Sequence, residues 1–147
     1  MTKVTDGNGG STQYGYDAMG NILSLTQPGS SSRYTYNAVG LPAKVSYLFE
    51  DGTAMENSFS YDAAGKMTGS QRSGSIAELL ADAAYTYDGA GRLLSYREGQ
   101  DTESYTYDAL GNRLTKKRNG IQTASYQYEG LNPLTTRTEN GRQYIYV

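Results

Sequence analysis

The chain has 147 residues, with 13 lysines and arginines against 15 aspartates and glutamates, a net charge of −2 and a pI of about 5.1. This length is typical of one domain, and the near-neutral charge argues against a nucleic-acid-binding surface. Cysteine and histidine are absent, which excludes disulfides and the usual nucleophile–base pairs of enzymes. We therefore expect no catalytic residue.

Tyrosine and glycine are abundant, with 15 and 18 residues, while large aliphatic residues are scarce. Such a composition by itself is typical of disorder, but regularly spaced tyrosines argue against it because each ring can bury apolar area. No apolar run follows a basic start, and none approaches about 18 residues, so we expect neither a signal peptide nor a membrane span in this chain.

A ten-residue pattern, clearest at residues 105–114, recurs along the whole chain. Two aromatic residues, Tyr105 and Tyr107, flank a threonine and suit a β-strand. Asp108 and Gly111 follow with the spacing of the first and last positions of a type I turn, and glycine takes positive φ without strain. The pattern therefore predicts a hairpin whose three-residue loop ends in a G1 bulge.

Thirteen of the 15 tyrosines belong to seven copies of this pattern, the last one cut short, and Phe59 takes the first aromatic position of the third copy. Such periodicity is the signature of a repeat architecture. The residues to which we assign the structural motif are Tyr14, Tyr16, Asp17, Gly20, Tyr34, Tyr36, Asn37, Gly40, Tyr61, Asp62, Gly65, Tyr85, Tyr87, Asp88, Gly91, Tyr105, Tyr107, Asp108, Gly111, Tyr126 and Tyr128.

The first half of the chain is a series of expected hairpins. Residues 3–9 have the character of a return strand and a turn. Pro28 with Gly29 is typical of a type II turn, and Asp51 with Gly52 of a type I′ turn. Strands are then expected at residues 12–17, 21–26, 32–37, 41–49, 53–62 and 66–71.

Residues 75–84 break the pattern. Apolar residues at positions 76, 79, 80 and 83 have helical spacing, and Ser75 with Glu78 has the spacing of a capping box. We expect a short helix inserted at this hairpin tip. The alternative is a longer pair of strands with an alanine-rich end.

The repeat resumes in the second half of the chain. Asn119 with Gly120 and Asn140 with Gly141 are typical of type I′ turns. Turns of two kinds therefore alternate, the Asp–Gly turn at one end of the hairpins and a two-residue turn at the other. The expected strands are 84–88, 92–97, 102–108, 112–118, 121–129, 133–138 and 142–147.

A G1-bulge hairpin places the second tyrosine of each pair opposite the residue two positions after the glycine. Tyrosine and this partner should define one face of the sheet, while Leu23, Leu94 and Leu114 point to the other. Two apolar faces suit a sheet packed within something larger, and a meander of about fourteen strands is expected to curl. The expected partners are Ile22, Pro42, Met67, Leu93 and Arg113.

The pattern Tyr-x-Tyr-Asp-x-x-Gly-(Asn/Arg)-x-Leu stands at residues 105–114 and nearly so at 14–23 and 85–94. It resembles the YD repeat, also called the Rhs repeat, of bacterial Rhs polymorphic toxins, the B and C components of insecticidal Tc toxins, and animal teneurins. The resemblance covers essentially all of the chain. It implies an all-β fold, an antiparallel meander of repeated β-hairpins that spirals into a hollow shell. In toxin members this shell encloses a cytotoxic polypeptide carried at the C-terminus.

The chain departs from the family pattern at several positions. Asn37 replaces aspartate in the second copy, and Glu129 and Asn132 replace aspartate and glycine in the sixth. The Asp-Pro segment of the family's autoproteolytic plug is absent. The chain begins behind an incomplete hairpin and ends inside a motif. We therefore interpret residues 1–147 as a single YD/Rhs-repeat domain of about six hairpin repeats with partial repeats at both ends, a piece of a larger shell protein or a remnant gene.

Three sets of side chains have alternative interpretations. The motif aspartates could bind calcium or cap turns, and we favour capping because each occurs singly whereas Ca²⁺ takes about six to eight oxygens. The tyrosines can pack across strands or stack on sugars, and we favour packing. Arginines at positions 33, 72, 92, 97 and 113 can cover ring faces or lie in solvent. We expect neither a metal site nor a cofactor.

The residues and the resemblance together predict a non-enzymatic structural module, a segment of a β-shell that encloses or displays a toxin or another polypeptide. Its expected partners are the rest of a larger YD-repeat protein, the enclosed polypeptide and, through open edge strands near residues 2–5 and 142–147, further copies of the chain. The alternative is a carbohydrate- or cell-surface-binding module that uses the tyrosine-rich face. We expect a bacterial protein, secreted or at the cell surface, without nucleic-acid partners.

Overall fold

The computed structural model describes residues 2–5, 7, 10–75, 81–130 and 133–146. Regular structure in this part of the chain consists of fourteen β-strands, which confirms the expected all-β antiparallel meander. The chain divides between Asp82 and Ala83 into two compact units, called here the N-terminal unit and the C-terminal unit.

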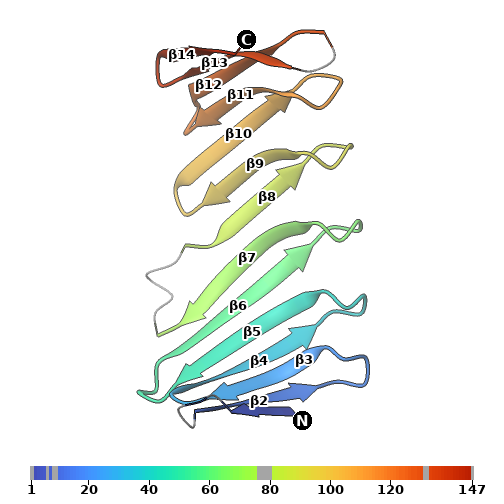
Figure 1. Ribbon diagram of the computed structural model, residues 1–147, viewed down its shortest axis with the longest axis vertical. Helices are drawn as coiled ribbons and strands as arrows, with labels where there is room; N and C mark the ends of the chain where they lie inside the picture. The colour runs from blue at the N-terminus through green and yellow to red at the C-terminus, as the bar shows by residue number, and fades with distance from the viewer. Residues whose placement is uncertain (1, 6, 8–9, 76–80, 131–132, 147) are drawn as a thin grey trace. The chain divides into compact units, whose positions relative to one another are not determined.

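The N-terminal unit contains seven strands, and each pairs antiparallel with the next in sequence (Figure 1). Tyrosine, serine and threonine recur in these segments, and aromatic and β-branched side chains favour the extended backbone. The strands are β1 (Thr2–Thr5), β2 (Ser11–Tyr16), β3 (Ile22–Gln27), β4 (Ser30–Tyr36), β5 (Pro42–Phe49), β6 (Ala54–Tyr61) and β7 (Met67–Gly74).

The C-terminal unit repeats this arrangement with seven further strands. Each strand again pairs antiparallel with its neighbours in sequence, so a hairpin is the building block of both units. The strands are β8 (Ala83–Tyr87), β9 (Leu93–Glu98), β10 (Asp101–Tyr107), β11 (Arg113–Arg118), β12 (Ile121–Tyr128), β13 (Leu134–Glu139) and β14 (Arg142–Ile145).

Turns of two kinds alternate within each unit, at opposite ends of the strands (Figure 1). One kind is the Asp–Gly turn described below. The other is short. Gly29 has the positive φ, +83°, that a type II turn requires at this position. Asn119 and Asn140 have φ of +49° and +48°, and each precedes a glycine of positive φ, which confirms two type I′ turns.

The turn at Asp51 and Gly52 differs from the type I′ turn expected there. Gly52 has a φ of +82°, but Asp51 is not among the residues of positive φ. Phe49 donates its N–H to the carbonyl of Thr53 at 2.9 Å, and Gly52 donates to the carbonyl of Phe49 at 3.0 Å. These bonds define a type I turn with a G1 bulge, so the expectation of a type I′ turn was wrong.

The helix expected over residues 75–84 falls largely on residues 76–80, which lie outside the described residues. Ala83 and Ala84 belong to strand β8. Arg72 on β7 donates its backbone N–H to the Asp82 carboxylate at 2.8 Å and its guanidinium to the carbonyl of Ala81. No helix in the described part of the chain is long and apolar enough to cross a membrane.

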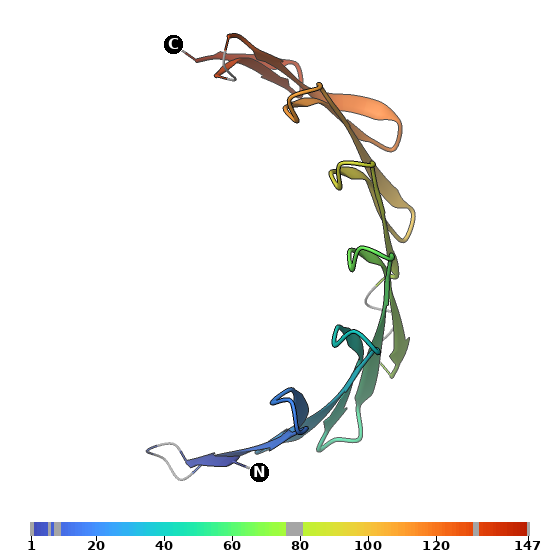
Figure 2. The same ribbon diagram turned by 90° about the vertical axis from the view of Figure 1, so that its right-hand side faces the viewer.

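Each unit is a single layer of strands, and few side chains are fully buried. Among the described apolar residues, Val45, Ala83, Ala124 and Tyr126 are the buried ones, each at most 9% exposed. Figure 2 shows each sheet bowed across its strands, as the accumulated twist of antiparallel strands requires. Backbone ladders and side chains that bridge neighbouring hairpins therefore stabilise the fold more than a conventional core does.

Candidate functional site: the aspartate–glycine corners

Each turn that carries the repeat motif is a five-residue corner, which begins at the aspartate or asparagine and ends one residue after the glycine. The N–H of the first residue donates to the carbonyl of the fifth at 2.8–3.0 Å, and the glycine N–H donates to the first carbonyl at 2.9–3.2 Å. The glycines have φ between +78° and +93°, so each corner is a type I turn with a G1 bulge. The five described corners are residues 17–21, 37–41, 62–66, 88–92 and 108–112.

The sixth corner keeps part of this geometry without the motif aspartate. Glu129 donates its N–H to the carbonyl of Pro133 at 3.1 Å, as the first residue does in the other corners. Gly130 has a φ of +52°. Residue 132, where asparagine replaces the motif glycine, lies outside the described residues.

The acidic side chain holds the corner from inside. In the four aspartate corners its Oδ1 accepts the N–H groups of the third and fifth corner residues at 2.8–3.0 Å. Asn37 does the same with its amide oxygen, at 3.1 Å from Val39 N and 2.9 Å from Leu41 N. Asparagine therefore supplies the same acceptor oxygen at this position as aspartate does in the other motif corners.

The fifth corner residue supports the second carboxylate oxygen. Asn21 and Asn112 donate their side-chain amides to Oδ2 of Asp17 and Asp108, each at 2.9 Å. These hydrogen bonds are the main reason that the pKa of both aspartates lies below its usual range. No three potential metal ligands come together in the described ranges of the chain, so the geometry favours turn capping over calcium binding.

The strand pairing beside each corner has the expected register, with the second tyrosine opposite the residue two after the glycine. The register then shifts by one residue in every hairpin, which leaves one extra residue in a second bulge. In three of the hairpins this extra residue is Leu23, Leu94 or Leu114. They are 36–42% exposed. The sequence pattern did not predict this bulge. The confirmed pairs are Tyr16–Ile22, Tyr36–Pro42, Tyr61–Met67, Tyr87–Leu93 and Tyr107–Arg113.

The second tyrosine also reaches the preceding hairpin through its hydroxyl. The hydroxyl donates to the backbone carbonyl of the residue that faces the second tyrosine of that hairpin. We call these bonds tyrosine latches. The four described latches, at 2.7–3.0 Å, join Tyr36 to Ile22, Tyr61 to Pro42, Tyr107 to Leu93 and Tyr128 to Arg113.

The latches replace backbone pairing between hairpins near the corners. Between β9 and β10 the ladder ends at Ser95 opposite Ser104 and does not extend to Leu93. The carbonyl of Leu93 accepts the Tyr107 hydroxyl instead, which satisfies a backbone group that pairing leaves open. Sequence reasoning missed this role, although a signal was present. The second aromatic position is tyrosine in all seven copies, whereas the first position admits Phe59.

Arg92 joins two successive corners of the C-terminal unit. Its Nε donates to Oδ2 of Asp88 at 2.6 Å in its own corner, and its Nη1 donates to the carbonyl of Asp108 in the next corner at 2.8 Å. The guanidinium also lies over the Tyr107 ring, 4.9 Å from the centroid. The backbone and side-chain hydrogen bonds from Arg92 hold the pKa of Asp88 below its usual range. Arg92 therefore acts as a structural link.

One face of the C-terminal unit carries tyrosines bridged by charged residues. The Arg113 guanidinium lies 5.6 Å from the Tyr105 centroid and 4.7 Å from the Tyr126 centroid. The Tyr105 hydroxyl donates to Glu103 at 2.5 Å, and Glu103 also forms an ion pair with Lys116 at 2.8 Å. Burial and then the hydrogen bond to Glu103 raise the pKa of Tyr105 to about 12. These rings are packed against protein groups.

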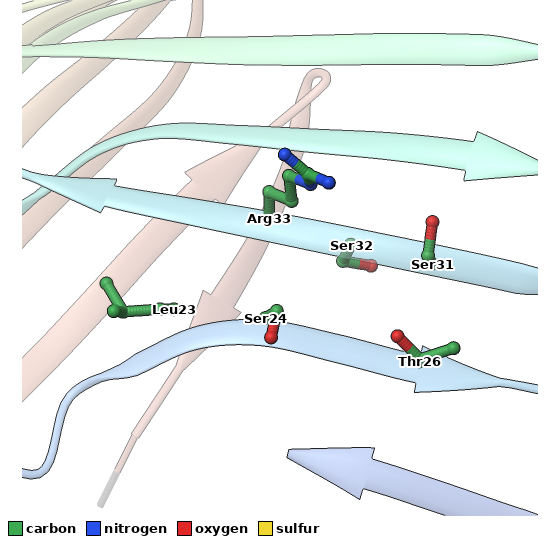
Figure 3. A pocket seen from close by; sticks show the side chains of 6 residues that line it. All are labelled: Leu23, Ser24, Thr26, Ser31, Ser32 and Arg33. Carbon is green, nitrogen blue, oxygen red and sulfur yellow. The ribbon is translucent and has the colours of Figure 1, made fainter. Parts of the chain in front are cut away.

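An open hollow of about 480 Å³ lies over β3 and β4 of the N-terminal unit (Figure 3). Ser24, Thr26, Ser31 and Arg33 line it, and Arg33 is exposed. Ser24 pairs opposite Arg33 and Thr26 opposite Ser31, so the four side chains share one face. No tyrosine lines this hollow, which gives no support to sugar stacking there.

These features define a class of protein: a β-hairpin repeat whose corners are capped by aspartate, turned by glycine and joined by tyrosine latches. The family model described as Teneurin YD-shell matches residues 32–146, and the one described as RHS Repeat matches residues 1–32. The chain belongs to the teneurin YD-shell family, and its first hairpins match the RHS repeat. The resemblance drawn from the sequence is thereby confirmed.

A toxin and several solved structures are similar to this chain. The chain is 31% identical over 135 residues to double-stranded DNA deaminase toxin A of Burkholderia cenocepacia (strain H111), and the match covers 80% of the chain but 9% of the toxin. The crystal structures of TcdB2-TccC3-Cdc42 and TcdB2-TccC3-TEV share its fold, with TM-scores of 0.73 and 0.72 at 20% identity. Each match covers 88% of this chain and 7% of the other. The chain thus spans a small part of the length of its relatives.

Proposed function

We propose that this chain is a non-enzymatic wall segment of a larger YD-shell protein, and that the wall encloses or displays a toxin or another polypeptide. The series of tyrosine latches is the observation that supports this most directly. Each latch uses a polar motif side chain to join one hairpin to the one before it. The motif tyrosines therefore hold successive hairpins together in one sheet.

The relatives support the same role. The match covers 9% of the deaminase toxin and 7% of the TcdB2-TccC3 chains, so a complete wall would need many such segments. The partner in this proposal is the remaining polypeptide of the same protein or complex. A toxin relative also fits a location outside the cell or at its surface.

Electron microscopy of the full-length protein that carries this segment tests the proposal. The expected result is a hollow particle in which these hairpins follow one another along the wall, with other polypeptide inside it or presented by it. Limited proteolysis is the second readout, and the enclosed polypeptide should resist digestion until the wall is unfolded. An open ribbon that neither encloses nor carries another polypeptide would contradict the proposal.

A second candidate function is binding of carbohydrate or a cell surface through the tyrosine-rich face. Tyr16, Tyr144 and Tyr146 favour it because they are 42–45% exposed. A glycan array tests this function. Specific binding that is lost in Tyr16→Ala but kept in Tyr105→Ala, whose ring packs against Arg113, would support it, and an array without specific signals would rule it out.

We also propose that residues 1–147 fold as a single YD-repeat domain. The repeat runs through the boundary between the two units, with second tyrosines at positions 61 and 87 on either side of it. Calorimetry of the chain should then show one cooperative unfolding transition. Two transitions, each assignable to one unit, would contradict a single domain.

A further inference from the structure

A second hollow, of about 400 Å³, lies on the tyrosine-bearing face of the C-terminal unit and is distinguished by its cationic side chains. Arg113 and Lys116 on β11 and Arg137 on β13 line it, with Tyr126 of β12 and Glu139 of β13. Tyr126 pairs opposite Arg137 in the ladder between β12 and β13. Three adjacent strands therefore contribute side chains to one site.

Arg113 carries the surplus positive charge of this hollow. Lys116 forms an ion pair with Glu103 at 2.8 Å, and Arg137 forms one with Glu139. Arg113 makes no ion pair within the described ranges, and its guanidinium donates one hydrogen bond, to the Tyr126 hydroxyl at 3.0 Å. Since a guanidinium has about five N–H donors, most of its donors are free for a ligand.

The side chains of the hollow are also preorganised to bind an anion. Contacts with the rings of Tyr105 and Tyr126 restrict the motion of Arg113. Nε of Arg137 is buried and has no acceptor among the described residues, and such a donor is unfavourable until a ligand or water satisfies it. Because a guanidinium already covers these two rings, the hollow offers N–H donors to a ligand and not bare ring faces. This chemistry favours an anion over a neutral sugar.

We propose that this hollow binds the carboxylate of an aspartate or glutamate side chain presented by the polypeptide that the wall encloses or displays. A planar guanidinium matches a carboxylate through two parallel hydrogen bonds, and Arg113 is placed to make them. The charge of the ligand follows from the hollow itself. Its identity as a polypeptide rests on the proposed function.

An NMR titration of the chain with a blocked hexaglutamate peptide tests the site, with hexaglutamine, acetate and sulfate as separate arms. The acidic peptide should cause saturable shifts on β11, β12 and β13, and Arg113→Gln should weaken its binding about ten-fold. Arg97→Gln is the matched control, because Arg97 is exposed on β9 and does not line the hollow. Equal binding of the two peptides, or equal affinity of the two variants, would overturn the proposal. Acetate or sulfate binding as tightly as the peptide would also overturn it.

Glu139→Gln gives a second test that does not depend on how well the fold tolerates a change at Arg113. This substitution frees the Arg137 guanidinium from its ion pair, so the affinity for the acidic peptide should rise about three-fold. Unchanged or weaker binding would overturn the site. The two proposals remain separable. A hollow particle whose segment binds no acidic peptide contradicts this site alone, and peptide binding by a protein that builds no wall contradicts the wall alone.

Discussion

The corner aspartate acts through its acceptor oxygens, and the asparagine corner shows this most clearly. Asn37 offers one acceptor oxygen to the same two backbone N–H groups, and its corner keeps the backbone hydrogen bonds of the aspartate corners. The carboxylate adds a second oxygen, which Asn21 or Asn112 binds in two corners. Loss of the acceptor should therefore matter more than loss of the charge.

Asp108→Ala should lower the urea midpoint of unfolding, and Asp108→Asn should lower it less. Alanine leaves the N–H groups of Leu110 and Asn112 without the acceptor that they have now, whereas asparagine keeps one acceptor as in the Asn37 corner. Urea denaturation followed by tyrosine fluorescence measures both variants. Equal losses would show that the charge holds the corner.

The corner aspartates also make stability depend on acid. Hydrogen bonds from Asn21 and Asn112 lower the pKa of Asp17 and Asp108 from the ordinary value of 3.8, so the folded state favours the ionised form more than the unfolded state does. This contribution is complete above about pH 4 and is lost as the pH falls through the lowered folded values. Urea midpoints measured from about pH 5 to pH 2 should fall, and more shallowly in the Asp17→Asn, Asp108→Asn double variant. Identical profiles would refute this account.

The tyrosine latch explains why the second aromatic residue carries a hydroxyl. Tyr107→Phe should destabilise the chain by about 1 kcal/mol, because the carbonyl of Leu93 loses its donor while the ring stays. Tyr85→Phe is the matched control. The Tyr85 hydroxyl has no hydrogen-bond partner among the described residues, and its ring contact with Tyr96, at 5.2 Å between centroids, survives the change. Equal stability of the two variants in urea would mean that the latch contributes nothing.

Each hairpin, as an element, is defined by its corner more than by its strands. The positions of Asp108 and Gly111 were enough to predict that Tyr107 pairs with Arg113, because loop geometry fixes the register. The bulge at Leu114 could not be predicted, because the residue types there do not distinguish a bulged strand from a regular one. The latches were missed for a related reason: they depend on how two hairpins meet, which a pattern within one hairpin does not describe.

The turn at Asp51 shows a limit of short sequence signals. Asp-Gly favours a type I′ turn when two residues separate the strands. Here β5 ends at Phe49 and β6 begins at Ala54, and the Asp51 carboxylate accepts the N–H of Thr53 at 2.8 Å. Asp51 is the third residue of this turn, whereas the motif corners are capped by their first residue. The longer spacing between the two strands, and not the dipeptide, therefore explains the turn.

Gly74 marks a point where two strands of one hairpin come close. Its φ is +112°, and a Cβ there would lie 2.3 Å from the carbonyl oxygen of Ala54. Gly74→Ala should destabilise the chain by about 3 kcal/mol, from backbone strain and overpacking together. Gly89→Ala is the control, because a Cβ there meets nothing within 4 Å and alanine occupies the same corner position at residue 109. Urea denaturation compares them, and similar midpoints would contradict this explanation.

At the scale of the whole molecule, the outer strands of a single-layer sheet determine whether it associates with further strands. In the described part of the chain, β1 pairs with β2 and β14 pairs with β13, each along one side. Val4 and Ile145 are 55% and 73% exposed on these strands. Unpaired backbone groups beside exposed apolar side chains recruit further strands. The same edges would let a longer wall continue, so edge pairing and the proposed wall function share one physical basis.

Edge pairing makes a prediction that one substitution can isolate. Tyr146 donates its N–H to the carbonyl of Thr135 at 2.9 Å, so the alternate residue Gln143 directs its N–H away from β13. Gln143→Pro removes that outward donor and breaks no hydrogen bond to β13. The chain should associate as its concentration rises in light scattering after size exclusion, and the variant should associate less, because proline blocks a new ladder. A wild-type chain that stays monomeric throughout, or a variant that associates equally, would show that these edges are closed to other strands.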